Sequence, residues 1–161
     1  MIVSYTTRPM RDYEVEGVQH YFVSEEEIDN LEKQNDLLAY TRFPKTGYRY
    51  CATVSSMKKD IMTYIINPDG IDYLEKNKDA LGIEYCVLYL KLSDEIIRKR
   101  ALERGDAADL IDQRLASESE QFDMFYASRR YNFCIDMQKG LEDIFSDVDT
   151  ALAGILTNSN V

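Results

Sequence analysis

Two arginines three residues apart, Arg8 and Arg11, follow a hydroxyl-rich stretch that begins at Ser4. A guanidinium group forms bidentate hydrogen bonds with phosphates and carboxylates, and serine and threonine hydroxyls add further donors. The segment therefore has the residue types of an anion-binding loop at the end of a short strand. The alternative is a solvated turn that Pro9 closes, and the residue types alone favour that simpler interpretation.

A second basic cluster lies later in the chain, where Arg98, Lys99, Arg100 and Arg104 fall within seven residues and Arg114 follows. Arg100 and Arg104 are four residues apart, so they share one face of a helix. Such a cluster has the charge needed to hold a polyphosphate and to stabilise a phosphoryl group in transfer. A solvated helix face that pairs with neighbouring acidic residues is the alternative, and the spacing does not decide between the two.

Tyrosines and an Asn-Pro-Asp-Gly turn are further candidates. The turn at Tyr48 and Tyr50 presents phenol hydroxyls that either hold a phosphate or simply pack a small sheet, and the packing role is favoured. Asn67 and Asp69 follow the apolar run Ile61–Ile66, which is typical of a parallel strand buried on both faces. Ligands bind outside the carboxyl ends of such strands, although this turn also has a purely structural explanation.

The composition of the 161 residues limits the function classes. With 19 basic and 29 acidic residues the net charge is −10, which disfavours general binding to DNA or RNA. The longest apolar run, Tyr85–Leu90, is far shorter than the roughly 18 residues of a membrane span, and the first residues lack the pattern of a signal peptide. Three separated cysteines and one histidine make neither a zinc site nor a disulfide framework. We therefore expect no metal site, no nucleic-acid or membrane partner, and a cytoplasmic location.

The spacing of apolar residues predicts an α/β protein. Short strands are predicted at residues 1–6, 20–23, 37–43 and 48–53, and strands buried on both faces at 61–66, 85–92 and 131–135. Helices are predicted after a capping box of Ser24 and Glu27, over 55–60, from 68 to about 78, and over 93–103, 109–126 and 141–156. One face of the last helix is expected to comprise Leu141, Ile144, Phe145, Val148, Leu152 and Ile155. The alternation in the second half predicts a parallel sheet with helical crossovers, and residues 20–53 predict a small mixed subdomain beside it.

Taken together, these segments resemble the guanylate kinase family. Ser4-Tyr-Thr-Thr-Arg-Pro-Met-Arg, then Glu14-Val-Glu-Gly17, then Tyr21-Phe-Val-Ser-Glu-Glu-Glu27 is similar to the family signature S-x-T-T-R-x-P-R … E-x-x-G … Y-x-F-V-S-x-E-E-F. The later segments that resemble the family's lid and its last core strand are Arg100-Ala-Leu-Glu-Arg104-Gly105, Ile111-Asp-Gln-Arg114-Leu115 and Tyr131-Asn-Phe-Cys-Ile-Asp136. The resemblance runs from Met1 to about Ile155 and is thinner between Leu37 and Gly82.

The resemblance implies one domain, residues 1–161, with the core of a P-loop nucleoside-monophosphate kinase. A nucleoside-monophosphate-binding subdomain would take about residues 4–53, the core 54–96 and 131–161, and the lid region 97–126. ATP- and Mg²⁺-dependent phosphorylation of GMP, or of a related nucleoside monophosphate, is the implied reaction. The candidate substrate-binding residues are Ser4, Arg8, Arg11, His20, Tyr50, Asn67 and Asp69, and the candidate catalytic residues are Arg100, Arg104 and Arg114. These residue types suit phosphoryl transfer, which depends mainly on positioning and charge stabilisation.

Several positions depart from the family pattern. A phosphate-contacting tyrosine of the family corresponds to His20, which also donates hydrogen bonds. The glutamate that reads guanine corresponds to Ala39, an aspartate corresponds to Asn67, and a hydroxyl residue corresponds to Ala52 or Thr53. A site that hydrogen-bonds a base edge discriminates through those polar groups, so reduced guanine specificity is expected.

The family's G-x-x-x-x-G-K-[ST] loop has no counterpart among these residues, because none of the seven glycines is followed by lysine. That loop supplies the phosphate cradle, the lysine and the Mg²⁺-binding hydroxyl, so this chain alone is not expected to bind ATP and Mg²⁺ productively or to transfer a phosphoryl group. The strand before the loop should lie centrally in the sheet, which leaves an open edge for a protein partner or an oligomer to cover. Three hypotheses remain: a kinase whose P-loop segment lies upstream, a catalytically inactive nucleotide-binding protein, and a module that binds phosphorylated peptides.

Overall fold

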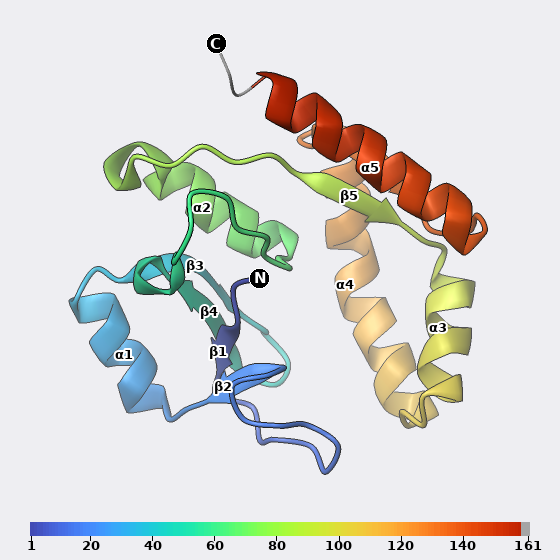
Figure 1. Ribbon diagram of the computed structural model, residues 1–161. Coiled ribbons are helices and arrows are strands. Elements are labelled where there is room, and N and C mark those ends of the chain that lie inside the picture. Colours follow the sequence, from blue (N-terminus) through green and yellow to red (C-terminus); the bar gives the residue numbers. More distant parts are fainter. Residues whose placement is uncertain (159–161) are drawn as a thin grey trace. The chain divides into compact units, whose positions relative to one another are not determined.

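The computed structural model describes residues 1–158, which form two compact units, Met1–Ile83 and a second unit that begins at Glu84 (Figure 1). Both units combine helices with a small sheet, so the predicted α/β class is confirmed. Within the described part of the chain, no helix has the length and apolar character needed to cross a membrane.

The first unit is built on a four-stranded sheet in the order β2-β1-β4-β3. Its strands, all within the predicted ranges, are β1 (Ser4–Thr6), β2 (His20–Phe22), β3 (Leu37–Arg42) and β4 (Arg49–Thr53). β1 runs parallel to β2 and antiparallel to β4, with Thr6 opposite Tyr50. β3 and β4 form an antiparallel hairpin in which Thr41 also lies opposite Tyr50. This register brings residues from distant parts of the chain into one row across the sheet.

Helix α1 (Glu25–Lys33) begins at the predicted capping box. The Ser24 hydroxyl accepts from the backbone N–H of Glu27, and the Glu27 carboxylate accepts in return from the backbone N–H of Ser24. Ile28 on this helix is fully buried and packs with Leu37 and Cys51 in the core of the first unit. The helix therefore covers one face of the sheet.

Helix α2 (Pro68–Leu81) packs along β3. Its start is set by local chemistry: the Asn67 side chain accepts from the backbone N–H of Gly70, and Pro68 occupies the first helical position. Gly70 has no space for a side chain, because an added Cβ would lie 2.7 Å from Cγ1 of Ile66. Gly82 ends the helix in the left-handed region, at φ 63°.

Two elements predicted in the first unit are wrong. The run Ile61–Ile66 is not a strand, and Ile61 and Ile65 are 68% and 82% exposed. Within this run the carbonyl of Thr63 accepts from the N–H of Ile2 at 2.8 Å, and a single bond does not make a ladder. The helix predicted over residues 55–60 is only the 3₁₀ turn η1 (Val54–Ser56), where the side chain of Asp36 accepts from both the backbone and the hydroxyl of Ser55.

The second unit confirms the predicted pair of parallel strands with a helical crossover. The strands are not buried on both faces as predicted, because Leu90 is 56% exposed and Cys134 is also exposed. β5 (Leu88–Lys91) pairs in parallel with β6 (Phe133–Asp136), and α3 (Asp94–Glu103) and α4 (Ala108–Ser128) form the connection between them. α3 and α4 pack against each other, while the last helix, α5 (Leu141–Asn158), packs on β6. Among the described residues this sheet has two strands.

The buried face of α5 is only partly the predicted one. Ile144 and Ala151 are buried against Ile135, with Val148 beside them, whereas Leu141 and Phe145 are 71% and 63% exposed. The helix approaches the sheet through its small residues, since Gly154 lies under the ring of Phe133. The face of α5 that contacts the sheet therefore includes Ala151 and Gly154. The prediction missed these two residues because it considered only large apolar side chains.

Candidate functional site

Several candidate substrate-binding residues share one face of the four-stranded sheet. Side chains alternate between the two faces along a strand, and residues directly opposite each other point to the same face. The strand register therefore defines a surface, here called the Ser4 face, made by Ser4, Thr6, His20, Phe22, Thr41 and Tyr50. The opposite face carries Tyr5, Tyr40 and Cys51 and packs on α1.

At the centre of the Ser4 face, a histidine, a serine and a tyrosine are in contact. Oγ of Ser4 and Nδ1 of His20 lie 2.8 Å apart in a hydrogen bond. The imidazole ring meets the ring of Tyr50 edge-on, with centroids 5.6 Å apart. β1, β2 and β4 each contribute one of these residues, so the arrangement depends on the sheet and not on local sequence.

Arg8 lies beside this group and is held from several sides. Its Nε donates to the Tyr50 hydroxyl at 3.2 Å, and its guanidinium carbon is 5.4 Å from the centre of the Phe22 ring. Nη1 and Nη2 donate to the two carboxylate oxygens of Glu14 at 2.8 and 2.7 Å, and Nη1 also donates to the carbonyl of Pro9. Of the five guanidinium N–H donors, one on Nη2 has no partner among residues 1–158.

Glu14 fixes Arg8 and the loop that follows β1. Its carboxylate is buried, accepts both Arg8 bonds, and also accepts from the backbone N–H of Arg11 at 2.8 Å. The hydrogen bonds from Arg8 lower the pKa of Glu14 to about 2, although burial opposes the shift. The hydrogen bonds to Glu14 in turn hold the pKa of Arg8 above its usual range. Arg11 itself is exposed and donates to the hydroxyl of Tyr13 at 2.8 Å.

Asn67 and Asp69 reach the same face through Thr41. Nδ2 of Asn67 donates to the Thr41 hydroxyl at 3.2 Å, and that hydroxyl donates to Asp69 at 3.3 Å. Since Thr41 lies opposite Tyr50, these two residues of α2 border the Ser4 face. The Oδ1 of Asn67 is already used as the helix cap. Ala39 and Ala52, which pair across the same hairpin, are fully buried and offer no polar group.

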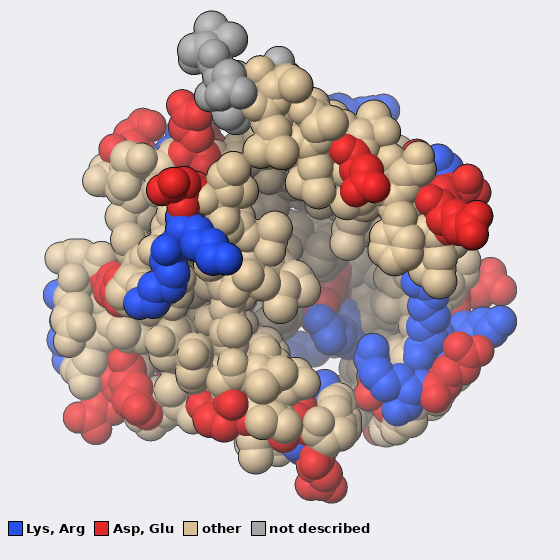
Figure 2. All heavy atoms as spheres, viewed as in Figure 1, with Lys and Arg blue, Asp and Glu red and all other residues tan. Residues whose placement is uncertain are grey.

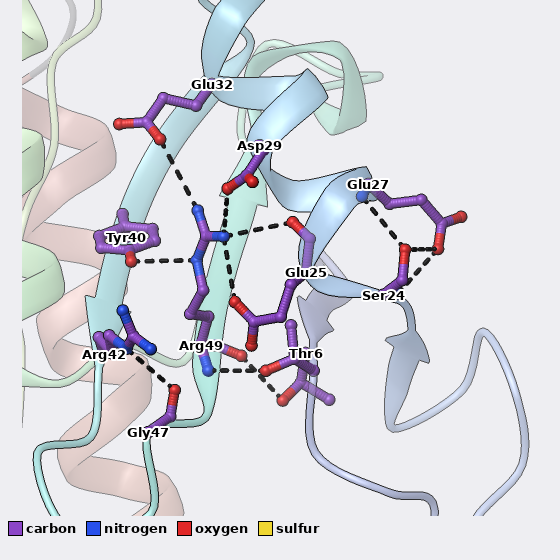
Figure 3. Close-up of polar contacts among 11 residues, drawn as sticks. Thr6, Ser24, Glu25, Glu27, Asp29, Glu32, Tyr40, Arg42, Gly47 and Arg49 are labelled. Atoms are coloured by element: carbon purple, nitrogen blue, oxygen red, sulfur yellow. Dashed lines mark hydrogen bonds and ion pairs between the residues drawn. The ribbon is translucent and has the colours of Figure 1, made fainter.

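Arg49 forms an ionic cluster on the α1 side of the sheet, in which its guanidinium is buried and its carboxylate partners are exposed, although the sequence did not single it out as a site residue (Figure 3). It is 5% exposed, and its guanidinium contacts three carboxylates of α1, those of Glu25, Asp29 and Glu32. Burial disfavours its charge, but the hydrogen bonds to Asp29 and Glu25 outweigh it and keep the pKa of Arg49 above its usual range. The acidic residues at positions 25, 29 and 32 lie on one helix face, and this spacing, which the prediction did not use, was the available signal for a buried cation.

Arg49 also connects this cluster to the loop that carries Arg8. Its backbone N–H donates to the Thr7 hydroxyl at 3.0 Å, and its carbonyl accepts from the Thr6 hydroxyl at 3.0 Å. The backbone N–H of Arg8 in turn donates to Oγ1 of Thr6 at 3.2 Å. The strand end that carries Arg8 is therefore anchored to β4 and, through Arg49, to α1.

The candidate catalytic arginines of the second unit have separate partners. Arg100 donates to the carbonyl of Met137 at 3.3 Å, Arg104 pairs with Asp106, and Arg114 pairs with Glu118. All three side chains are exposed. On the face that Figure 2 shows, basic and acidic side chains are intermingled and do not form a continuous basic surface.

The site thus assembles only some of the predicted residues. Ser4, His20, Arg8 and Tyr50 contact one another, Asn67 and Asp69 are linked through Thr41, and Arg11 joins through the carboxylate of Glu14. Glu14 was part of the recognised motif but not of the predicted site. Its position six residues after Arg8 was the available signal. Among residues 1–158, no group of three His, Cys, Asp or Glu side chains is placed to hold a metal ion.

Comparison with known proteins adds an independent line of information. A family model described as "Guanylate kinase" matches residues 1–154. The guanylate kinase of Lactiplantibacillus plantarum is 29% identical over 139 residues, covering 83% of this chain and 64% of that protein. The guanylate kinase of Haemophilus influenzae is 29% identical over 156 residues, covering 89% of this chain and 70% of that protein. The chain therefore spans about two thirds of the length of these relatives.

A solved structure extends the comparison to three dimensions. The guanylate kinase of Anaplasma phagocytophilum superimposes with a TM-score of 0.67 at 20% sequence identity. The match covers 99% of this chain and 75% of the Anaplasma protein. At that identity the likeness establishes the fold and leaves the residues of the site to be argued from their own geometry.

Proposed function

The chain belongs to the guanylate kinase family, and from that premise we propose that its first unit binds the phosphate of a nucleoside monophosphate, GMP in the first instance, on the Ser4 face. The observation that carries the proposal is the convergence of Ser4, His20, Arg8 and Tyr50 from three strands and a loop. These side chains supply two hydroxyls, an imidazole and a guanidinium, which are the hydrogen-bonding groups that suit a phosphate.

Phosphate binding here would use a preformed arrangement. The bidentate contact with Glu14 holds the Arg8 guanidinium in place, so little side-chain entropy remains to be lost on binding. Arg8 and Glu14 together are nearly neutral, and Arg11 at the rim supplies the net positive charge that a dianion needs. We therefore expect removal of Arg8 to eliminate a hydrogen-bond donor for the phosphate and to disorder the loop that follows β1.

Guanine recognition is proposed to be weak. Ala39 and Ala52 have no side-chain acceptor for the N–H groups of a guanine edge, and Oδ1 of Asn67 is occupied by the N-cap of α2. Asp69 is the remaining carboxylate of the group and is hydrogen-bonded to Thr41. We infer that the phosphate and sugar contribute most of the affinity and that other nucleoside monophosphates bind within about tenfold of GMP.

Phosphoryl transfer is proposed only for a protein that carries, in addition to these 161 residues, a lysine-bearing phosphate loop. ATP with Mg²⁺ would be the donor, and Arg100, Arg104 and Arg114 would act on its phosphates. Arg104 and Arg114 form exposed ion pairs with nearby acids, and such a pair is worth about 1 kcal/mol or less. Arg100 is also exposed and donates to the carbonyl of Met137. We expect all three to exchange these contacts for a phosphate at little cost. No step is assigned to a metal held by the described residues.

The test is calorimetric titration of the protein with GMP, AMP and guanosine. Wild type should bind both monophosphates and should not bind guanosine measurably. Arg8→Ala combined with Tyr50→Phe should weaken GMP binding at least tenfold, because the double change removes one charge and one hydroxyl from the same site. A matched control is Arg98→Ala, which removes an exposed arginine paired with Asp112 in the second unit. Equal binding of GMP and guanosine, or an unchanged affinity in the double variant, would refute the site.

A further inference from the structure

The single histidine of the chain stands among the groups of the Ser4 face. His20 is half-buried at the start of β2, and its Nδ1 is bonded to the Ser4 hydroxyl at 2.8 Å. Its ring meets Phe22 and Tyr50 edge-on, at centroid distances of 5.8 and 5.6 Å. With Nδ1 occupied by serine, Nε2 is the ring atom left to contact a ligand.

The charges around His20 come from one loop. Arg8, Arg11 and Glu14 lie near enough to influence it electrostatically, and Glu16 forms a backbone bridge to it. The neighbours from β1 and β4 are uncharged hydroxyl side chains, those of Ser4 and Tyr50. Burial first, and then the charges of Arg8 and Arg11, hold the pKa of His20 below its usual value, while Glu14 opposes them. The imidazole is therefore neutral near pH 7 before a ligand enters.

We propose that His20 makes phosphate binding at this site proton-linked: a phosphate monoester dianion binds together with one proton, which the imidazole takes from solvent. This inference rests on the proposed function, since it names the protonation state in which the same site holds its ligand. Its physical basis is a half-buried ring that is bonded to Ser4 and packed against Tyr50, the two hydroxyl residues proposed to hold the phosphate. A doubly negative group there favours the imidazolium form and offsets the burial that disfavours it.

The direction of the effect follows from linkage. If the phosphate raises the proton affinity of His20, the proton must raise the phosphate affinity by the same factor. GMP affinity should therefore increase as the pH falls from 8 toward 6.5, by up to about tenfold per pH unit where the proton is taken up in full. Arg8 and Glu14 do not share in this titration, because their contact moves the pKa of Glu14 to about 2 and that of Arg8 above its usual range.

The matched variant is His20→Asn, which keeps a polar atom near the Ser4 hydroxyl but does not titrate in this range. Calorimetry of GMP binding at pH 7.5, in two buffers of different ionisation enthalpy, gives the number of protons taken up per GMP bound. Titrations at pH 6.5, 7.0, 7.5 and 8.0 then give the affinity profile. Protonation of GMP itself is common to both proteins, so the difference between wild type and His20→Asn isolates the histidine.

For wild type we expect uptake of about half a proton or more at pH 7.5, and for His20→Asn close to none. The GMP affinity of wild type should also rise more steeply toward low pH than that of the variant. Equal proton uptake in the two proteins, with GMP still bound, would overturn the role of His20 and leave the proposed function standing. No binding of GMP by wild type at any of these pH values would overturn both, so the two failures are distinguishable.

Discussion

Arg8 and Arg49 of the first unit and Arg104 and Arg114 of the second unit are stabilised in opposite ways. In the first unit, Arg8 and Arg49 are held by partners from other parts of the chain: the Arg49 pair with Asp29 spans 20 residues of sequence, and the Arg8 contact with Tyr50 spans 42. In the second unit, Arg104 and Arg114 pair with acids two and four residues away and remain exposed. Arg8 and Arg49 therefore form a fixed arrangement of charge, whereas Arg104 and Arg114 have exposed local contacts that allow them to reorient.

This difference fits the two roles proposed above for these arginines, phosphate binding and phosphoryl transfer. A site that must recognise a small phosphate gains from preorganised donors, since their ordering is completed before the ligand arrives. Arginines that must follow a phosphoryl group as it moves gain from weak, replaceable contacts. If the contrast holds, substitutions of buried arginine contacts in the first unit should lower the free energy of unfolding more than substitutions of exposed pairs.

The largest effect is expected at Arg49. Arg49→Ala removes a buried guanidinium and its hydrogen bonds from β4 to Glu25 and Asp29 of α1. Because several hydrogen bonds are lost at once, we expect the free energy of unfolding to fall by about 3 kcal/mol, measured by urea unfolding followed by tyrosine fluorescence. Arg98→Ala, which breaks the exposed pair with Asp112, should lose less than about 1 kcal/mol. If Arg49→Ala and Arg98→Ala lowered the free energy of unfolding equally, the contrast between the buried and the exposed arginine would be contradicted.

A smaller, pH-dependent effect is expected at Glu14. Its pKa is lowered to about 2 in the folded protein from an ordinary value of 4.5, so its contribution is complete above pH 4.5 and is lost as the pH falls toward 2. At pH 7 the free energy of unfolding of Glu14→Gln should be about 2 kcal/mol lower than that of wild type. As the pH falls, the variant should not show the part of the decline in stability that comes from protonation of Glu14. Unfolding measured from pH 7 to pH 2.5 tests both statements.

The control for that prediction lies in the same unit. Glu75→Gln removes an exposed carboxylate that pairs with Lys78, and it should cost less than about 1 kcal/mol. If Glu14→Gln and wild type declined in parallel toward acid pH, the bidentate contact with Arg8 would not be the stabilising feature described above.

The smallest effects are expected at two helical glycines. Gly70→Ala in α2 places a Cβ 2.7 Å from Cγ1 of Ile66 and should destabilise the first unit by about 1 kcal/mol or more. Gly154→Ala in α5 places a Cβ 3.4 Å from the ring of Phe133, an ordinary contact, and should stabilise the second unit by about 0.5 kcal/mol through helix propensity. Thermal unfolding of the two variants should shift the midpoint in opposite directions, and a shift in the same direction would contradict this reading of the packing.

Features set by neighbouring residues could be predicted from the sequence. The predicted capping box of Ser24 and Glu27 depends on contacts within three residues, and it forms. The parallel pairing of β5 with β6 also follows, because the two apolar runs are separated by helical segments long enough to cross over.

Features that depend on a distant partner could not be predicted in the same way. The run Ile61–Ile66 has the composition of a buried strand, but a strand needs a neighbour, and among the described residues it bonds outside its own region only through Thr63. Arg49 looked like one basic residue of a tyrosine turn, because its carboxylate partners lie 17 to 24 residues earlier in the sequence. The motif that identified the family named Arg8, but only the structure shows that Glu14 already occupies two of its nitrogens.

The most direct test of the central claim is a titration of ¹⁵N-labelled protein with GMP, followed by the backbone amide shifts. The proposal predicts that the amides of β1, β2 and β4 and of the loop that carries Arg8 shift first, and that guanosine at the same concentration leaves them unmoved. Shifts confined to α3 and α4, or no shifts at millimolar GMP, would contradict the assignment of the phosphate site to the Ser4 face.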